Sequence, residues 1–162
     1  MIPPLPRIAV QAGPFDLTRE YEALTAGQRR IGGIGSFIGV VRGESAGQSE
    51  QLQGMTLEHY PGMTEKQIRR IAEEAIRRWS LLGCTIIHRI GYLPAGAPIV
   101  LVMTAAPHRE AALESTSFLI DWLKTKAPFW KQEHLEDGTI RWVAARDEDE
   151  IAADRWNILN AS

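Results

Sequence analysis

The chain has 162 residues, of which 44% are hydrophobic and 23% are charged, and its formal net charge is −2. These are ordinary values for a globular protein of one domain, and they give no general reason to expect nucleic acid or an anionic membrane as a partner. No apolar stretch approaches the roughly 20 residues that a membrane helix needs. The segment from Met1 to Arg7 lacks the pattern of a signal peptide, and the single cysteine, Cys84, excludes an internal disulfide. We therefore expect one cytoplasmic domain that spans residues 1–162.

The first half of the chain predicts three strands and two helices. Apolar residues at helical spacing make the helix from Thr64 to Trp79 the best supported element, and Thr64 with Gln67 matches a capping box. Asp16 can cap an earlier helix that ends near Ala26. After an extended lead-in within 1–13, the predicted elements are a strand at 7–11, a helix at 16–26, a glycine-rich strand at 31–42, a strand at 52–60 and a helix at 64–79.

The second half predicts four strands and a second long helix. Pro107 suits the first turn of that helix, and Pro128 disfavours helical geometry at Ala127, so the helix ends near Lys126. The predicted elements are strands at 84–91 and 98–105, the helix at 107–126, a hairpin of strands at 129–135 and 139–145, and an acidic, helix-compatible tail within 147–162. Because the strands come in neighbouring pairs, we predict an α+β fold with a mainly antiparallel sheet.

The segment from Lys124 to Lys131 carries three lysines around a proline and two aromatic rings. Rings lower the local dielectric, and a lysine beside other cations and apolar groups has its neutral form favoured, so it can act as a base or a nucleophile. A cation in the last helical turn is also what the helix dipole alone favours, and that effect would oppose nucleophilicity. Lys124 and Lys131 are the strongest catalytic candidates, and Lys126 is a weaker candidate for substrate binding.

His108 and Arg109 open the same helix, where unpaired N–H groups and partial positive charge suit an anion. The alternative is that Glu110 and Glu114 neutralise Arg109 while His108 is a solvated cap. A helix of about 20 residues is roughly 30 Å long, so His108 and Lys124 cannot meet within one chain. If both serve one site, they come from different protomers.

Two more arginines are candidates for binding an anion. Arg42 ends the glycine-rich strand beside a flexible loop, where its guanidinium can bind a phosphate bidentately. It could equally be a surface arginine. Arg146 follows the last strand and could join a basic pocket, although its acidic neighbours favour a plain salt bridge.

Other readings of the motifs are weak. The third glycine of a dinucleotide-binding fingerprint is missing after Gly35, and no phosphate-binding G-K-[ST] motif exists. The four histidines and one cysteine show no metal-ligand spacing, so we expect neither a metal nor a cofactor. Cys84 is predicted to be a small buried hydrophobe, His88 a satisfied histidine at the edge of the core, and His134 a surface residue of the hairpin.

Several segments together resemble the large, catalytic subunit of molybdopterin synthase. The likeness runs from about Pro14 to Trp156, in order and with near-matching spacing. The segments are Leu57 to Lys66, His88 to Gly91, His108-Arg109, Lys124 to Lys131 and Arg141 to Val143. Two departures are Lys126, where an arginine is common in the family, and a slightly longer turn at 136–139.

The resemblance implies a fold of the α/β hammerhead type with a small β subdomain, and a homodimer that forms the core of a heterotetramer. It implies a sulfurtransferase that moves sulfur from the thiocarboxylated Gly-Gly C-terminus of a small ubiquitin-like carrier to cyclic pyranopterin monophosphate, forming the molybdopterin dithiolene. Lys124 and Lys131 match the family's lysines near the carrier tail. The other site residues that we carry over are Arg42, His108, Arg109, Lys126 and Arg146 for the anionic substrate, and Phe37, Phe129 and Trp130 for the carrier-tail pocket.

Two functions of other kinds stay open on sequence alone. A non-catalytic module could bind a phosphorylated ligand or a partner's C-terminal tail without turnover. An acyl-transfer or amide-forming enzyme could use a nucleophilic lysine. Both would keep the same basic segment, so the sequence does not separate them from the sulfurtransferase.

Overall fold

The computed structural model describes residues 2–44, 50–143 and 147–160, without the side chains of 147–149 and 158–160. It is an α+β fold, as the pairing of neighbouring strands predicted, and its strands form two four-stranded sheets. The central sheet has the order β1 (Arg7–Gln11), β4 (Gly83–Arg89), β6 (Pro98–Ala106), β2 (Gly33–Val40). The end sheet has the order β5 (Gly91–Pro94), β3 (Leu52–His59), β7 (Phe129–Leu135), β8 (Ile140–Trp142).

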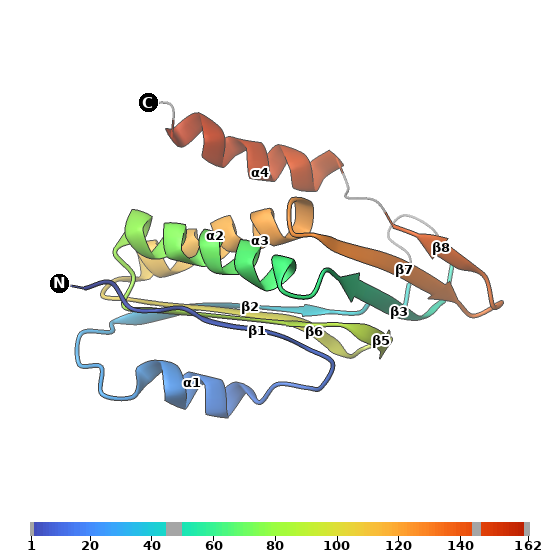
Figure 1. Ribbon diagram of the computed structural model, residues 1–162, viewed down its shortest axis with the longest axis horizontal. Helices are drawn as coiled ribbons and strands as arrows, with labels where there is room; N and C mark the ends of the chain where they lie inside the picture. Colours follow the sequence, from blue (N-terminus) through green and yellow to red (C-terminus); the bar gives the residue numbers. More distant parts are fainter. Residues whose placement is uncertain (1, 45–49, 144–146, 161–162) are drawn as a thin grey trace.

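Helices cover both faces of the central sheet (Figure 1). The short helix α1 (Leu17–Thr25) lies on one face, and α2 (Met63–Trp79) and α3 (Arg109–Thr125) lie together on the other. The main core fills the space between α2, α3 and the sheet, with the inward side chains Cys84 and Ile86 of β4 in it. The end sheet extends from one end of these layers, so β7 begins beside the C-terminal end of α3. In the described part of the chain, no helix combines the length and apolar character of a membrane span.

The C-terminal helix α4 (Asp147–Asn160) packs over α3 on the side away from the sheet (Figure 1). The indole N–H of Trp156 donates to a carboxylate oxygen of Asp121 at 2.7 Å, and Arg155 contacts the same oxygen at 3.1 Å. The Trp156 ring also lies 5.5 Å from the guanidinium carbon of Arg78, which faces the rings of Trp79 and Phe118 as well. The acidic tail predicted from sequence is therefore a docked helix.

The structure corrects three local predictions. Helix α2 begins at Met63, and at its start the Glu65 carboxylate accepts from the Gly62 N–H, whereas the sequence pattern pointed to a capping box of Thr64 and Gln67. Thr64 instead accepts from the Tyr60 N–H. The predicted single strand at 84–91 is divided, because Gly91 takes a positive φ of 82° and turns the chain into β5 of the other sheet. His134 was expected on the surface, but it is half-buried and bonded to the Thr56 hydroxyl at 2.8 Å.

Candidate functional site

The turn between α3 and β7 holds the two principal lysines on either side of Pro128. Helix α3 ends at Thr125, and the N–H of Phe129 bonds back to the Ala127 carbonyl at 2.8 Å, which folds the chain sharply around the proline. The buried hydroxyl of Thr64, at the start of α2, donates to the Pro128 carbonyl at 3.2 Å. Lys124 and Lys131 are thus carried on a turn that is held from inside and from a neighbouring helix.

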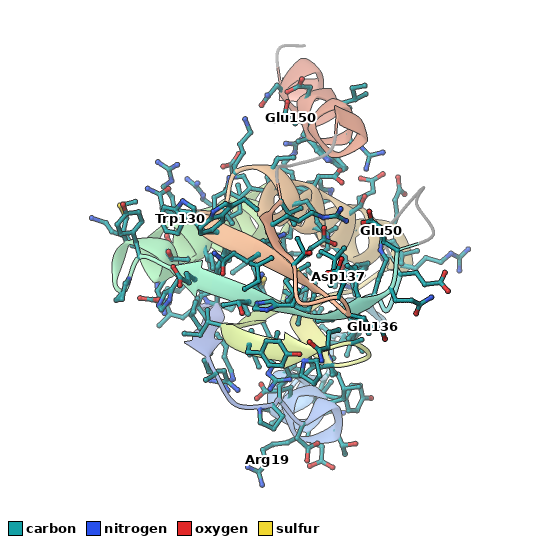
Figure 2. All side chains as sticks on the ribbon, turned by 90° about the vertical axis from the view of Figure 1, so that its right-hand side faces the viewer. Arg19, Glu50, Trp130, Glu136, Asp137 and Glu150 are labelled. Atoms are coloured by element: carbon teal, nitrogen blue, oxygen red, sulfur yellow. The ribbon has the colours of Figure 1, made fainter. Side chains whose placement is uncertain are left out.

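The two faces of β7 carry different groups. Strand β7 pairs antiparallel with β3, with Lys131 opposite Leu57 and Phe129 opposite His59. Leu57 is fully buried, so Phe129 and Lys131 share the inner face of the end sheet. Trp130, which Figure 2 labels beside β7, lies between them in sequence and therefore on the outer face. Its ring centroid is 4.6 Å from that of Tyr60. The structure does not bring Trp130 to the same side as Phe129 and Lys131.

A row of residues crosses the central sheet below the end of α3. Val100 of β6 pairs with Gly39 of β2 on one side and with His88 of β4 on the other. His88 shares its face with Cys84 and Ile86, which point into the core beneath the helices. Phe37 lies on the face of β2 that also carries Gly39, and its ring is 3.5 Å from the position a Gly39 Cβ would take. Phe37 and His88 therefore lie on the same face of the central sheet, the face that α2 and α3 cover.

Positive charges converge on His88. Its imidazole stacks on the Phe129 ring with the centroids 3.9 Å apart and the planes 19° from parallel. Burial chiefly, together with the nearby Lys131, Lys124 and His59, lowers the pKa of His88 to about 3, against the opposing hydrogen bond to the Arg89 carbonyl. Both lysines are therefore close enough to His88 to act on one imidazole. Lys124 and Lys131 thus both act on His88, and their joint catalytic role stays a prediction.

The remaining basic candidates divide between the two ends of α3. Arg42 is exposed and lies two residues beyond the end of β2, the strand that carries Phe37. His108 is the N-cap of α3 and Arg109 its first residue, and both are exposed. A helix of 17 residues is about 25 Å long, so this pair lies far from Lys124 in the same chain. Arg146 lies outside the described residues.

Lys126 occupies a different place. It lines a cleft of about 220 Å³ between α2, α3 and α4, together with Arg70, Trp122 and Trp156, and neither Lys124 nor Lys131 lines this cleft. Within the described ranges, no group of three or more His, Cys, Asp or Glu side chains could hold a metal ion. Cys84 is buried, as predicted, and burial raises the pKa of its thiol to about 12, so it is no nucleophile at neutral pH.

Comparisons with known proteins agree with this geometry. The family model described as MoaE protein matches residues 10–126. The chain belongs to the MoaE protein family. A relative from Pseudomonas aeruginosa, the molybdopterin synthase catalytic subunit, is 49% identical over 149 residues, which cover 92% of this chain and 97% of that protein.

Two solved structures of the MoaE family share its fold. The molybdopterin biosynthesis MoaE protein of Burkholderia ambifaria superposes with a TM-score of 0.78 at 45% identity, covering 94% of this chain and 98% of that one. The molybdopterin synthase of Staphylococcus aureus superposes with a TM-score of 0.74 at 28% identity, covering 84% and 96%. The α+β architecture described above is therefore the MoaE fold.

Sequence reasoning left His88 and His59 without a role at this site. His59 faces Phe129 across the end sheet, and its Nε2 lies 3.1 Å from a carboxylate oxygen of Glu65. The only sequence signal for His88 was a histidine within an apolar strand, a pattern that is more often structural. Its place under Phe129 follows from strand register, which one sequence does not reveal.

Proposed function

We propose that this chain is the catalytic subunit of a molybdopterin synthase. It transfers sulfur from the thiocarboxylated C-terminus of a small ubiquitin-like carrier to cyclic pyranopterin monophosphate, which makes it a sulfurtransferase. The observation that carries the proposal is that, in a chain of the MoaE family, Lys124 and Lys131 both act electrostatically on the buried ring of His88. The proposed location is the cytoplasm, which agrees with a lone, free cysteine.

The chemistry matches this set of side chains. A thiocarboxylate and a phosphorylated pterin are both anions, so cationic groups are needed to hold them together. The thiocarboxylate sulfur bonds to a pterin carbon as a carbon–oxygen bond at that carbon breaks and the oxygen leaves with a proton. Water then cleaves the acyl–sulfur bond of the resulting thioester, which releases the carrier as a carboxylate and leaves the sulfur on the pterin. Lys124 and Lys131 orient the tail and donate or accept protons in these steps. Sulfur arrives on the partner, so the buried thiol of Cys84 is not required.

An exposed aromatic face supports a protein partner. The outer face of the end sheet carries four large side chains that register places together and that are 40–62% exposed. They are Tyr92, Trp130, Ile140 and Trp142. Apolar patches of this kind on a folded protein mark interaction sites. Trp130 neighbours Phe129 and Lys131 on one strand, although their side chains lie on the other face. We therefore propose the carrier as the occupant of this face, with its tail passing around the start of β7 to the lysine site.

The free edge of β2 supports a homodimer. Strand β2 ends the central sheet, and its side chains Phe37, Ile38 and Val40 are 37–49% exposed. An unpaired strand edge is a template for a second strand, and twofold symmetry makes two such strands antiparallel. Gly33 at the start of β2 touches Arg109. Pairing two β2 strands about a twofold axis therefore brings His108 and Arg109 of one copy to the other copy's Lys124.

The test is reconstitution with purified components. The chain is mixed with a thiocarboxylated carrier and cyclic pyranopterin monophosphate, and the dithiolene product is measured. Product formation is expected; binding of both ligands without product would instead favour the non-catalytic module.

Mass spectrometry of the chain during turnover tests the acyl-transfer alternative, since a lysine-linked adduct that forms and decays at the reaction rate would favour it. With no such adduct, the lysines act as proton donors and electrostatic groups.

A further inference from the structure

A buried histidine lies where the two lysines converge, and the proposed function uses it in no step. His88 is 4% exposed and is the one fully buried histidine of the four in the chain. Its neighbours across the sheet, Val10 and Val100, are apolar. Burying a polar side chain among apolar neighbours costs free energy unless its polar atoms are hydrogen-bonded. The presence of a histidine at this position therefore needs an explanation.

The imidazole is held in one orientation and one tautomer. Its Nδ1 lies 2.9 Å from the carbonyl oxygen of Arg89, and a carbonyl only accepts, so Nδ1 carries the proton. One flat face of the ring stacks on Phe129 at a centroid distance of 3.9 Å. His88 therefore fixes the first residue of β7 against the end of β4, although these strands belong to different sheets.

Burial first, and then the charged groups around the ring, explain why it stays neutral. Lys131 and Lys124 act on it with positive charge, and Glu65 contacts the neighbouring His59. A protonated imidazole would add a buried positive charge beside two lysines. A neutral aromatic ring fills the same place without repelling either lysine.

We propose that His88 is a positioning residue for the sulfur-transfer site, acting as a neutral stacked ring that fixes Phe129 and thereby the position of Lys131 relative to Lys124. This inference rests on the proposed function. The connection runs from His88 to Phe129 by stacking, and from Phe129 to Lys131 along one face of β7. A displacement of about 1 Å at a reacting group can lower a rate by a factor on the order of 100.

The test compares three variants in the full complex with its carrier. His88→Ala removes the ring, and His88→Phe keeps a neutral ring that can stack. Phe15→Ala is the control, because it removes a half-buried ring that packs on the far face of the central sheet. We expect His88→Ala to lower kcat by at least about tenfold while KM for the pterin changes less than about threefold. His88→Phe should recover most of kcat, and Phe15→Ala should keep it. Melting temperatures are measured for all three variants.

The outcomes separate positioning from simple stabilisation. An effect confined to KM, or a loss in His88→Phe as large as in His88→Ala, would overturn the inference. So would a loss that vanishes when the assay is run well below the melting temperature of the variant. Nitrogen NMR of the holo complex gives a readout without turnover: His88 should keep its proton on Nδ1 between pH 8 and pH 5, and a ring protonated on Nε2 contradicts the proposal. If the unaltered chain makes no dithiolene, it is the proposed function that fails.

Discussion

The hydroxyl of Thr64 donates a hydrogen bond to the carbonyl of Pro128, at 3.2 Å, and so joins the start of α2 to the turn that separates the two lysines. The same hydroxyl accepts from the N–H of Tyr60 at 3.0 Å, and Thr64 is fully buried. One side chain therefore joins the start of α2 to the segment before it and anchors the turn of the candidate site.

Replacing Thr64 by valine keeps the volume and removes both hydrogen bonds. The buried Tyr60–Pro128 connection is lost, and each polar group left unsatisfied costs about 1–3 kcal/mol. We expect the free energy of unfolding, measured in urea, to fall by about 1–3 kcal/mol. Product formation should also fall, even at a low temperature at which the variant is folded, because the turn shifts. Thr56→Val is the matched control, since Thr56 bonds His134 away from the turn. Equal activity in the two variants would argue against the anchoring role.

Removing Lys124 tests the chemistry of the site. Lys124→Ala is expected to abolish product formation, a loss of at least about 100-fold, because proton transfer and charge stabilisation are both lost. Carrier affinity, measured by calorimetry, should stay nearly intact. Lys66→Ala, which removes an exposed lysine of α2, is the control and should behave like the unaltered chain. Normal turnover by Lys124→Ala would end its catalytic assignment.

Mixing two inactive variants tests whether the site is shared between copies. Lys124→Ala and Arg109→Ala homodimers should each be inactive. If Arg109 acts on the neighbouring copy's Lys124, a mixed dimer holds one intact site, so a random mixture recovers about a quarter of full activity by the statistics of twofold assembly. A site built within one chain recovers none. Native mass spectrometry confirms that subunits exchange, because the mixed dimer has a mass of its own.

A charge on the aromatic face should weaken carrier binding. Trp142 is 62% exposed and packs little in the free chain, so Trp142→Glu should leave the melting temperature nearly unchanged. Burying an unpaired carboxylate at an interface is costly, and we expect carrier affinity to fall by at least about tenfold. Tyr21→Glu on α1, a site 50% exposed on a different face, is the control. An unchanged Kd for Trp142→Glu would move the carrier to another surface.

His88 makes stability depend on pH. Its pKa is about 3 in the fold, against about 6.5 in an unfolded chain, so the unfolded state binds a proton first as the pH falls. This contribution to stability is complete above pH 6.5 and is lost between pH 6.5 and about 3. The unfolding free energy should drop by about 2 kcal/mol more between pH 7 and pH 5 than in His88→Phe, which has no titrating ring. Urea titrations at the two pH values measure this, and equal drops would contradict the assigned burial.

Local pattern was enough for most of the elements. The apolar period of α2 and the prolines that bound α3 placed both long helices within about two residues, and β1 and β7 lie where alternation and hairpin signals put them. These signals depend on residues that are near in sequence, so they can be recognised without knowledge of the fold. The division at Gly91 was missed, because a glycine with positive φ is not distinguishable by sequence from one inside a strand.

The sequence by itself determined which groups could do the chemistry: the lysines that flank Pro128 and the His-Arg pair one helix length away. Only the tertiary structure decided which of them meet. It put Trp130 on the opposite face from Lys131, Lys126 in a separate cleft, and His88 beneath Phe129. The physical reason is that the alternation of side chains along one strand follows from neighbouring residues. The register between strands depends instead on long-range packing that brings distant parts of the chain together.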